Sequence, residues 1–332
     1  MIRVGLLGTG RIGSLHAESI ASHRESTLTA VSDINDETAN NLAAQYGAIV
    51  KSADEIISDT NIDAILIATS TDTHSYFIEK AAAAGKAILC EKPVDLSLVR
   101  AKECLDKVSA AKNPIMVGFN RRFDPNFAQL KKSLDDGEIG ECELLTVTSF
   151  DPAPPPISYV KTSGGLYRDM MIHDFDLSNF IMDELPISIS AVGHSLVDPA
   201  IGLAGDVDTA VVTMVYADGK IAVIKNSRRA AYGYDQRIEI LGSEGLLQAE
   251  NILENSVVKS NNDGVISAKP KCFFLERYFG AFKAEWDAFL KSIRNHETVP
   301  VTLKDGVAAL AMAEAATQSQ NTGKSIQLKE LL

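Results

Sequence analysis

The sequence predicts a two-part α/β protein: an N-terminal, doubly wound parallel sheet followed by an α+β domain with a large, mostly antiparallel sheet. The chain has 332 residues, which is more than one hydrophobic core usually serves. Short apolar runs alternate with helical patterns in its first third, and such alternation favours a parallel sheet covered on both faces. Between residues 187 and 248, apolar runs are joined by hairpin turns, which favours an antiparallel sheet.

Five strands and four helices are predicted in the first third. Each strand is a short apolar run, and each helix carries apolar residues at helical spacing. The strands are Ile2–Leu7, Leu28–Ser32, Ala64–Ala68, Ala87–Cys90 and Ile115–Phe119, and the helices are Ile12–Ser22, Asp36–Tyr46, Thr73–Ala84 and Leu96–Ala111. We place the end of this domain at residue 119, so that the second domain covers residues 120–332.

A proline-rich loop and several hairpins organise the predicted second domain. The loop Asp151–Pro156 is stiff and cannot join a central strand. Ser163-Gly164-Gly165 follows, and a helical pattern then runs through Ile181. The predicted strand pairs are Val211–Tyr216 with Ile221–Ile224 and Arg237–Leu241 with Leu246–Gln248. Two helices end the chain, Phe274–Arg294 and Asp305–Ser319, and the second of them can pack back on the first domain.

The composition excludes several classes of partner. The formal net charge is −12 at pH 7, and such an acidic surface repels nucleic-acid phosphates and anionic lipids. No apolar segment approaches the ~18 residues that span a bilayer, and the N-terminus lacks the pattern of a signal peptide, so we expect a cytoplasmic protein. The four cysteines are far apart, which favours reduced, buried thiols over a zinc site or disulfides. We expect no metal.

A glycine motif near the N-terminus predicts dinucleotide binding. Gly8-Thr9-Gly10-Arg11-Ile12-Gly13 fits G-x-G-x-x-G, follows the first strand and opens a helix, whose N-terminus favours phosphates. Asp33 ends the second strand. Its carboxylate can accept hydrogen bonds from ribose hydroxyls and would repel a 2′-phosphate, so the predicted cofactor is NAD and the first domain is of the Rossmann type. The predicted cofactor-binding residues are Gly8, Gly10, Arg11, Ile12, Asp33, Ser70, His74, Glu91 and Lys92.

Two further groups of residues indicate chemistry on a substrate. Lys92 lies in Glu91-Lys92-Pro93, after the fourth strand, and the carboxyl ends of parallel strands line the ligand crevice of a doubly wound sheet. Asp169, His173 and Asp176 have the spacing i, i+4, i+7, which puts them on one face of a helix. There the aspartate can fix the histidine tautomer, so that the free ring nitrogen accepts a proton. A solvated polar helix face and a metal site are the alternatives for this trio.

For two other polar groups, the residue types alone favour a structural role over a functional one. The tyrosines of Tyr232-Gly233-Tyr234-Asp235 are most simply explained by packing in a turn, and Arg121-Arg122 by a solvated basic pair. Composition and spacing thus indicate a dinucleotide-binding protein with an added α+β domain, and they do not name its substrate.

Taken together, these segments resemble the glucose–fructose oxidoreductase / inositol dehydrogenase (Gfo/Idh/MocA) family almost from end to end. The segments that carry the resemblance are Gly8–Gly13, Cys90–Pro93, Gly118–Asp124, Asp151–Pro156, Gly164–Asp176 and Tyr232–Asp235. The proline-rich loop followed by Ile-His-Asp-Phe-Asp, together with Tyr-Gly-Tyr-Asp, is typical of the inositol dehydrogenase-like group. The resemblance implies a C-terminal sheet that makes homodimer contacts, within a homotetramer.

The resemblance also implies a site and an activity. Lys92, Asp169 and His173 would be the catalytic residues: His173 the general base, Asp169 its orienting partner and Lys92 the ligand of the reacting oxygen. The implied substrate-binding residues are Arg121, Asp151, Tyr234 and Asn120. The implied reaction is NAD-dependent oxidation of a ring hydroxyl of myo-inositol, or of a close cyclitol, to the ketone.

Three alternatives stay open on the sequence. The same chemistry could act on scyllo- or chiro-inositol, or on a pyranose sugar. Some members of the family hydrolyse glycosides with tightly held NAD, and a cofactor-binding regulatory protein without turnover is the third alternative. Every version of the dehydrogenase requires Lys92 and His173, from different halves of the chain, to converge beside the nicotinamide ring.

Overall fold

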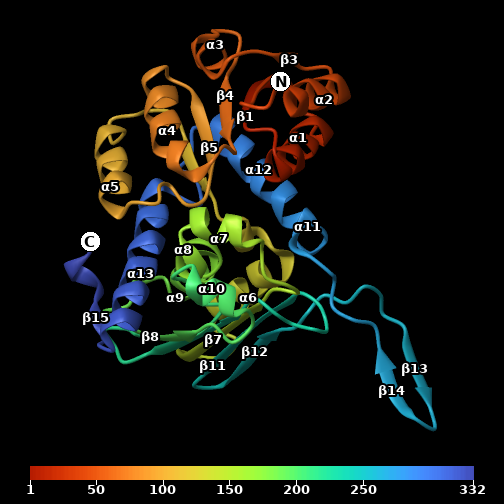
Figure 1. Cartoon of the computed structure of the whole chain (residues 1–332), viewed down its shortest axis with the longest axis vertical. Coiled ribbons are helices and arrows are strands. Elements are labelled where there is room, and N and C mark those ends of the chain that lie inside the picture. The colour runs from red at the N-terminus through yellow and green to blue at the C-terminus, as the bar shows by residue number, and fades with distance from the viewer. The chain divides into compact units, whose positions relative to one another are not determined.

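The computed structural model describes all of residues 1–332, which form two compact units (Figure 1). The first unit combines residues 1–120 with residues 281–310, and the second combines residues 121–280 with residues 311–332. The division predicted from the sequence, residues 1–119 and 120–332, expected a return only of the helix 305–319; the segment that belongs to the first unit is residues 281–310. None of the helices combines the length and the apolar character needed to span a bilayer.

The first unit is built on a parallel six-stranded sheet with the strand order β3-β2-β1-β4-β5-β6. Its strands are β1 (Ile2–Leu7), β2 (Ser26–Ser32), β3 (Ile49–Val50), β4 (Ala64–Ile67), β5 (Ala87–Glu91) and β6 (Ile115–Gly118). Its connecting helices are α1 (Arg11–Ser22), α2 (Asp36–Tyr46), α3 (Ala53–Ser58), α4 (His74–Ala83) and α5 (Leu98–Lys107). The order reverses direction at β1, as in a doubly wound dinucleotide-binding sheet, so the predicted fold class is confirmed.

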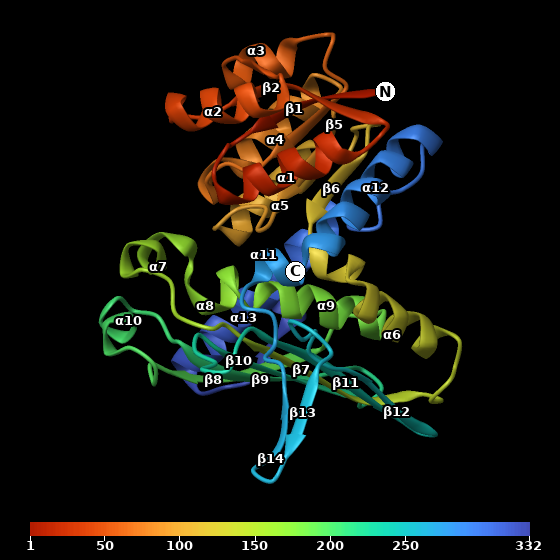
Figure 2. The same ribbon diagram turned by 90° about the vertical axis from the view of Figure 1, so that its right-hand side faces the viewer.

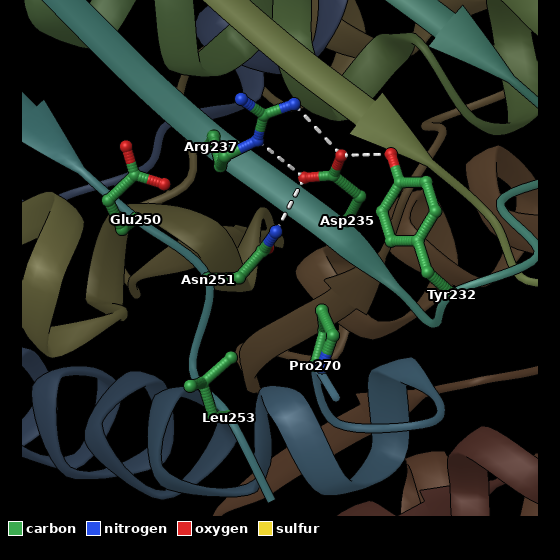
Figure 3. A pocket seen from close by; sticks show the side chains of 7 residues that line it. All are labelled: Tyr232, Asp235, Arg237, Glu250, Asn251, Leu253 and Pro270. Atoms are coloured by element: carbon green, nitrogen blue, oxygen red, sulfur yellow. Dashed lines mark hydrogen bonds and ion pairs between the residues drawn. The ribbon is translucent and has the colours of Figure 1, made fainter. Parts of the chain in front are cut away.

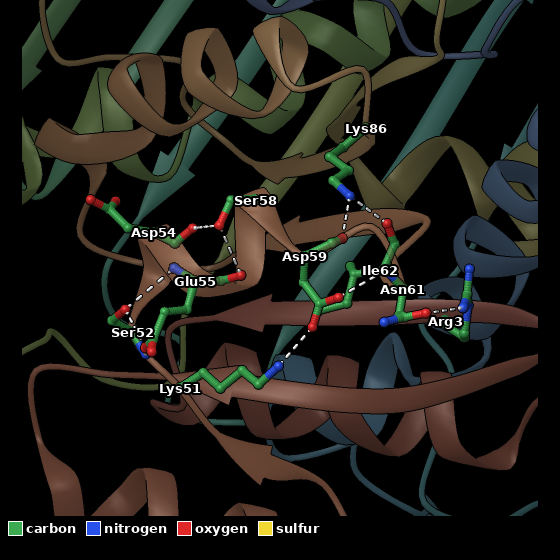
Figure 4. A network of polar contacts seen from close by, with 10 residues as sticks. All are labelled: Arg3, Lys51, Ser52, Asp54, Glu55, Ser58, Asp59, Asn61, Ile62 and Lys86. Atoms are coloured by element: carbon green, nitrogen blue, oxygen red, sulfur yellow. Dashed lines mark hydrogen bonds and ion pairs between the residues drawn. The ribbon is translucent and has the colours of Figure 1, made fainter.

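Two short elements, β3 and α3, were not predicted, and local polar contacts explain α3 (Figure 4). Ser52 and Glu55 form a reciprocal capping box at its N-terminus. Just past its other end, the Lys86 ammonium donates to the carbonyl oxygens of Asp59 and Ile62, at 2.6 Å each. A helix of six residues is too short to show a helical period, so only its capping box indicates the helix in the sequence.

The segment that returns to the first unit packs through specific contacts. It comprises most of α12 (Phe279–Asn295) and the start of α13 (Leu303–Thr322). The indole of Trp286 is 1% exposed and donates to the Ser26 hydroxyl at 3.0 Å. The Val117 amide donates to the Val301 carbonyl at 3.2 Å. Residues near the end of the chain therefore complete the core around the N-terminal sheet.

The second unit is built on a seven-stranded mixed sheet with the order β12-β11-β7-β10-β9-β8-β15. Its strands are β7 (Cys142–Phe150), β8 (Ser188–His194), β9 (Thr209–Val215), β10 (Ile221–Ser227), β11 (Asp235–Gly242), β12 (Gly245–Ala249) and β15 (Ile326–Gln327). Only β7 and β10 pair in parallel, and the other neighbours are antiparallel. The predicted mostly antiparallel sheet is therefore confirmed.

The two faces of this sheet differ. Helices α6 (Pro125–Asp135), α8 (Gly165–Asp169) and α9 (Ile172–Met182) lie over one face (Figure 2). On the other face, apolar side chains are exposed on five strands, namely Val192, Val211, Ile221, Leu241 and Leu246. A hairpin of β13 (Val258–Asn261) and β14 (Gly264–Ser267) extends away from the sheet, and all its strand residues are exposed. Of the four cysteines, all unpaired, Cys272 is exposed rather than buried.

Candidate functional site

The glycine motif forms the turn between β1 and α1, and its glycines have different environments. Gly8 has a φ of +94°, and a Cβ there would lie 2.2 Å from the carbonyl oxygen of Ala68. A Cβ on Gly13 would lie 2.0 Å from the carbonyl oxygen of Gly8. Gly10, which caps α1, would place its Cβ in open space, and no side chain caps this helix end. The turn therefore fits a dinucleotide, because a pyrophosphate can approach the backbone at Gly10 and the N–H groups behind it.

Asp33 follows β2 beside this turn. Its Oδ2 accepts from the Thr9 amide at 2.6 Å and the Thr9 hydroxyl at 3.0 Å, and its Oδ1 accepts from the Asn35 amide at 2.9 Å. Burial alone would raise the pKa of Asp33, but these hydrogen bonds lower it overall. The side chain is thus a carboxylate at neutral pH, suited to ribose hydroxyls and unsuited to a 2′-phosphate.

The remaining predicted cofactor residues lie at the carboxyl edge of the same sheet or in the first turn of α1. Arg11 and Ser70 are exposed and Ile12 is half-buried. Glu91 and His74, however, use their polar atoms within the protein. The Glu91 carboxylate contacts His16 at 2.8 Å, and the His74 ring nitrogens face two backbone carbonyls. Their contact with a cofactor stays a prediction.

The helix predicted to carry both Asp169 and His173 is interrupted, so the single-helix expectation is wrong. Asp169 ends α8, and His173 is the second residue of α9. The amide of Met171 bonds to a carbonyl five residues back, and the amide of Asp174 bonds to one only three residues back. This change in hydrogen-bond register breaks the four-residue ladder on which the i, i+4 argument depends.

The two carboxylates of the trio have different partners in the second unit. Asp169 accepts from the Tyr159 hydroxyl at 2.9 Å and contacts the Arg228 guanidinium at 3.5 Å. Asp176 is 1% exposed and forms a two-pronged ion pair with Arg122, at 2.8 and 2.5 Å. Because this pairing engages Asp176 with a cation, it disfavours the alternative of a metal site. No group of three potential ligands in the chain has metal-binding geometry.

Two polar rows interrupt the apolar inner face of the seven-stranded sheet. Gln236, Ser149 and Asn226 are neighbours across β11, β7 and β10, and all three are buried. Two residues further along these chain segments come Tyr234, Asp151 and Arg228, which alternation directs to the same face. The preceding row is Ile238, Val147 and Ile224, all buried and apolar. Polar residues at inward positions of a strand need partners.

Arg121 and Asp174 supply partners for two of these residues, Ser149 and Asn226. The Arg121 guanidinium, 4% exposed at the residue level, donates to the Ser149 hydroxyl at 2.9 Å and forms an ion pair with Asp174. Asp174 also accepts from Ser149 at 2.7 Å and from the Asn226 amide at 2.8 Å. The Tyr278 ring lies against the guanidinium, at 5.6 Å from its centroid. The interpretation of Arg121-Arg122 as a solvated basic pair is therefore wrong.

Three of the substrate-binding residues implied by the resemblance, Arg121, Asp151 and Tyr234, share one electrostatic environment. Burial opposes the charge of Arg121, but Tyr278, Asp174, Tyr234 and Asp151 raise its pKa overall. Burial raises the pKa of Asp151 to about 6, although Arg228 and Arg121 oppose that shift. Asn120 is buried and begins the short helix Asn120–Phe123 that includes Arg121. The structure thus brings Arg121, Asp151 and Tyr234 together.

Several residues of this cluster were missed from the sequence. Three of them lie at inward positions of strands, where a polar residue is unusual, namely Ser149, Asn226 and Gln236. The alternation of inward and outward positions along each strand could have identified them from the sequence. Asp174 lies in a helix segment that is buried almost all round. A carboxylate in such a segment needs a buried cation, but the sequence alone does not indicate which one.

A pocket lies on the opposite side of β11, and several of its polar lining residues bond to Asp235 (Figure 3). Asp235 alternates with Tyr234 and Gln236, so it points to the other face. Its carboxylate accepts from Tyr232 at 2.6 Å, from Arg237 at 2.7 Å and from Asn251 at 2.7 Å. Tyr232 is 47% exposed, so it closes the turn through this hydrogen bond rather than by packing.

The fold and the first unit's turn define a class of protein. A doubly wound parallel sheet, a glycine turn open at Gly10 and an ionised Asp33 together form a binding site for NAD. The second unit holds a buried polar cluster of its own. The class is that of NAD-dependent oxidoreductases.

Comparisons with known proteins identify the family. A model of an oxidoreductase family with an NAD-binding Rossmann fold matches residues 2–119, and a model of the GFO/IDH/MocA C-terminal domain matches residues 127–248. The chain therefore belongs to the GFO/IDH/MocA family.

Individual relatives cover nearly the whole chain. An inositol 2-dehydrogenase of Rhizobium meliloti is 46% identical and aligns over 98% of this chain and 99% of its own. A myo-inositol 2-dehydrogenase of Thermotoga maritima is 41% identical over 100% of both chains. The crystal structure of scyllo-inositol dehydrogenase from Lactobacillus casei, with bound NAD(H) and scyllo-inositol, is similar with a TM-score of 0.93, 30% identity and 99% coverage of each chain.

Proposed function

We propose that the protein oxidises a ring hydroxyl of myo-inositol, or of a close cyclitol, to the ketone, with NAD as the hydride acceptor. The observation that carries this proposal is the buried polar cluster around Arg121, Asp151 and Tyr234. A polyol ring offers hydroxyls in several directions, and only convergent donors and acceptors can pair with them. The names of the relatives, which include myo- and scyllo-inositol dehydrogenases, support this class of substrate.

Three residues would carry out the reaction. In this proposal the His173 imidazole accepts the hydroxyl proton as general base, and the Lys92 ammonium donates a hydrogen bond to the reacting oxygen. Asp169, held by Tyr159 and Arg228, supplies a negative charge that favours the imidazolium form of His173. Bound NAD supplies the hydride acceptor, and the residues of this chain supply proton transfer and orientation.

Discrimination among isomers would come from the polar cluster. A wrong stereoisomer leaves a buried donor or acceptor unpaired, which costs about 1–3 kcal/mol for each such group. We propose that Arg121 donates to substrate hydroxyls, that Asp151 accepts from them and that Tyr234 does either. Three such contacts are sufficient to rank myo-, scyllo- and chiro-inositol by turnover.

A panel of polyols and sugars with NAD tests the substrate class. We expect NADH absorbance to rise fastest with myo-inositol, more slowly with scyllo- or chiro-inositol, and least with glucose. Faster turnover of glucose than of every cyclitol would contradict the proposal. Free sugar released from a glycoside without net NADH would favour the glycosidase alternative, and NAD binding without any turnover would favour a regulatory protein.

Alanine variants test the roles of Lys92 and His173. Each variant should lower kcat by about 10²–10⁴, the usual contribution of a general acid or base, while NADH still binds with a measurable affinity. A fluorescence titration with NADH measures that affinity. A variant that keeps the wild-type kcat would remove its residue from the mechanism.

We also propose that the protein is a cytoplasmic homotetramer, whose subunits use the exposed face of the seven-stranded sheet. Val211 and Ile221 are 45% and 40% exposed on this face, and exposed apolar side chains on a sheet face favour association. Light scattering should give a tetramer for the wild type and smaller species for Val211→Lys. A monomeric wild type would contradict this assembly, and recovery of the native protein with the membrane fraction would contradict its location.

A further inference from the structure

Two buried histidines flank the tripeptide Glu91-Lys92-Pro93 in the first unit. His16, on α1, is 1% exposed, and its Nε2 lies 2.8 Å from Oε1 of Glu91. The other oxygen of that carboxylate accepts from the backbone amide of Lys92 at 3.2 Å. Glu91 therefore joins the helix behind the glycine turn to the backbone of Lys92.

His74, at the start of α4, holds the other side of the tripeptide. It is also 1% exposed, and its Nδ1 lies 2.7 Å from the carbonyl oxygen of Pro93. Its Nε2 lies 3.1 Å from the carbonyl oxygen of Thr69. Both neighbours are acceptors, and burial lowers the pKa of His74, so the neutral ring has one N–H to donate. The shorter contact assigns that N–H to Pro93.

Both ring nitrogens of His74 are engaged within the protein, so a positioning role replaces the cofactor contact predicted for it from the sequence. The ring of His74 is buried between two carbonyl oxygens, and the engaged nitrogen of His16 faces a carboxylate of the same turn. Each histidine thus contacts a residue adjacent to Lys92 in the chain. A shift of about 1 Å in a reacting group lowers rates by about 10², so the support of this turn affects catalysis directly.

We propose that His16 and His74 are positioning residues that fix the backbone on both sides of Lys92 and thereby aim its ammonium group. This inference rests on the proposed function of Lys92. Because His16 lies on α1, it also connects the dinucleotide turn at the start of that helix to the position of Lys92.

Matched amide variants test the proposal, because the two histidines use different ring nitrogens. A glutamine amide reaches about as far as Nε2, and an asparagine amide about as far as Nδ1. His16→Gln and His74→Asn should therefore keep kcat within about threefold of wild type. His16→Asn and His74→Gln should lose about 10–10² in kcat, with the affinity for NADH preserved. We therefore expect glutamine to preserve kcat better than asparagine at position 16, and asparagine to preserve it better than glutamine at position 74.

A second measurement does not depend on turnover. Hydrogen exchange of a peptide spanning residues 87–95, followed by mass spectrometry, reports the order of the turn itself. Exchange should accelerate in His16→Asn and His74→Gln and stay at the wild-type rate in the matched partners. Unchanged exchange in all four variants, or equal effects of asparagine and glutamine at each position, would overturn the inference.

The same data separate this inference from the proposed function. If wild-type enzyme turns over no polyol while exchange follows the matched pairs, the proposed substrate fails and the two histidines still order the turn. If turnover is as proposed and kcat is equal in all four variants, the positioning role fails and the proposed function stands. A fall in melting temperature without the predicted ranking indicates a purely structural role, which also overturns the inference.

Discussion

The two units hold their candidate functional residues by different physical means. In the first, glycines allow close backbone approach, and histidines contact a backbone carbonyl and a carboxylate around Lys92. In the second, Arg121 and Asp174 form a buried ion pair that a serine and an asparagine complete. A neutral amide can imitate the contacts of the first unit. The second unit depends on a balance of buried charge, which no neutral side chain can imitate.

The largest effect is expected from removing one charge of the buried pair. Asp174→Asn leaves the Arg121 guanidinium without its counter-charge in a buried position, so we expect a loss of about 3–5 kcal/mol in the free energy of unfolding. Urea denaturation measures it. The matched control in the first unit is Asp63→Asn, whose partner Arg3 is solvent-exposed; that loss should be much smaller. Equal losses would show that burial does not distinguish the two pairs.

The second prediction uses the pH dependence of Asp151. The folded protein keeps the Asp151 proton up to about pH 6, whereas the unfolded chain releases it near the ordinary value of 3.8. The stability contributed by this carboxyl is therefore present below the ordinary pKa and lost as the pH rises through the folded pKa. Asp151→Asn removes this titration. The quantity to compare is the unfolding free energy of the variant minus that of the wild type. This difference should be larger at about pH 7.5 than at about pH 4.5, by about 1–3 kcal/mol. A constant difference would contradict the raised pKa.

The smallest effect is expected from a single methyl group in the first unit. Gly10→Ala places its Cβ in open space, so the melting temperature should stay within about 1–2 °C of wild type. The Kd for NADH should rise about tenfold, roughly 1.4 kcal/mol, because the methyl group occupies the approach of the pyrophosphate. Gly13→Ala, which meets a carbonyl oxygen at 2.0 Å, is the control that should unfold readily. Unchanged NADH affinity in Gly10→Ala would place the cofactor elsewhere.

Local patterns predicted the fold of the first unit well. Its five main strands are buried apolar runs, and its glycines lie where the backbone must approach closely, so each signal is contained in a few neighbouring residues. The helix through Asp169 and His173 was wrong because the spacing of side chains does not reveal a change in hydrogen-bond register. Six-residue α3 was missed because it is too short to show a helical period, and only the capping box of Ser52 and Glu55 marks it in the sequence.

The cluster in the second unit could be predicted only in part. Resemblance named Arg121, Asp151 and Tyr234, which the structure brings together. Asp174, Ser149 and Asn226 were not named, because the contacts of Ser149 and Asn226 with Asp174 depend on the register of β7 and β10. Those strands are far apart in the sequence and pair in parallel, so no local pattern gives that register.

The return of residues 281–310 to the first unit has a consequence for biosynthesis. The ribosome releases the N-terminal sheet early, but Trp286 and Val301, which complete its core, emerge only when the chain is nearly finished. The nascent sheet therefore exposes apolar surface until these residues are synthesised, and exposed apolar surface promotes aggregation and chaperone binding. A fragment that stops at residue 119 would remain permanently in that state, so co-expression with residues 281–310 should improve its solubility.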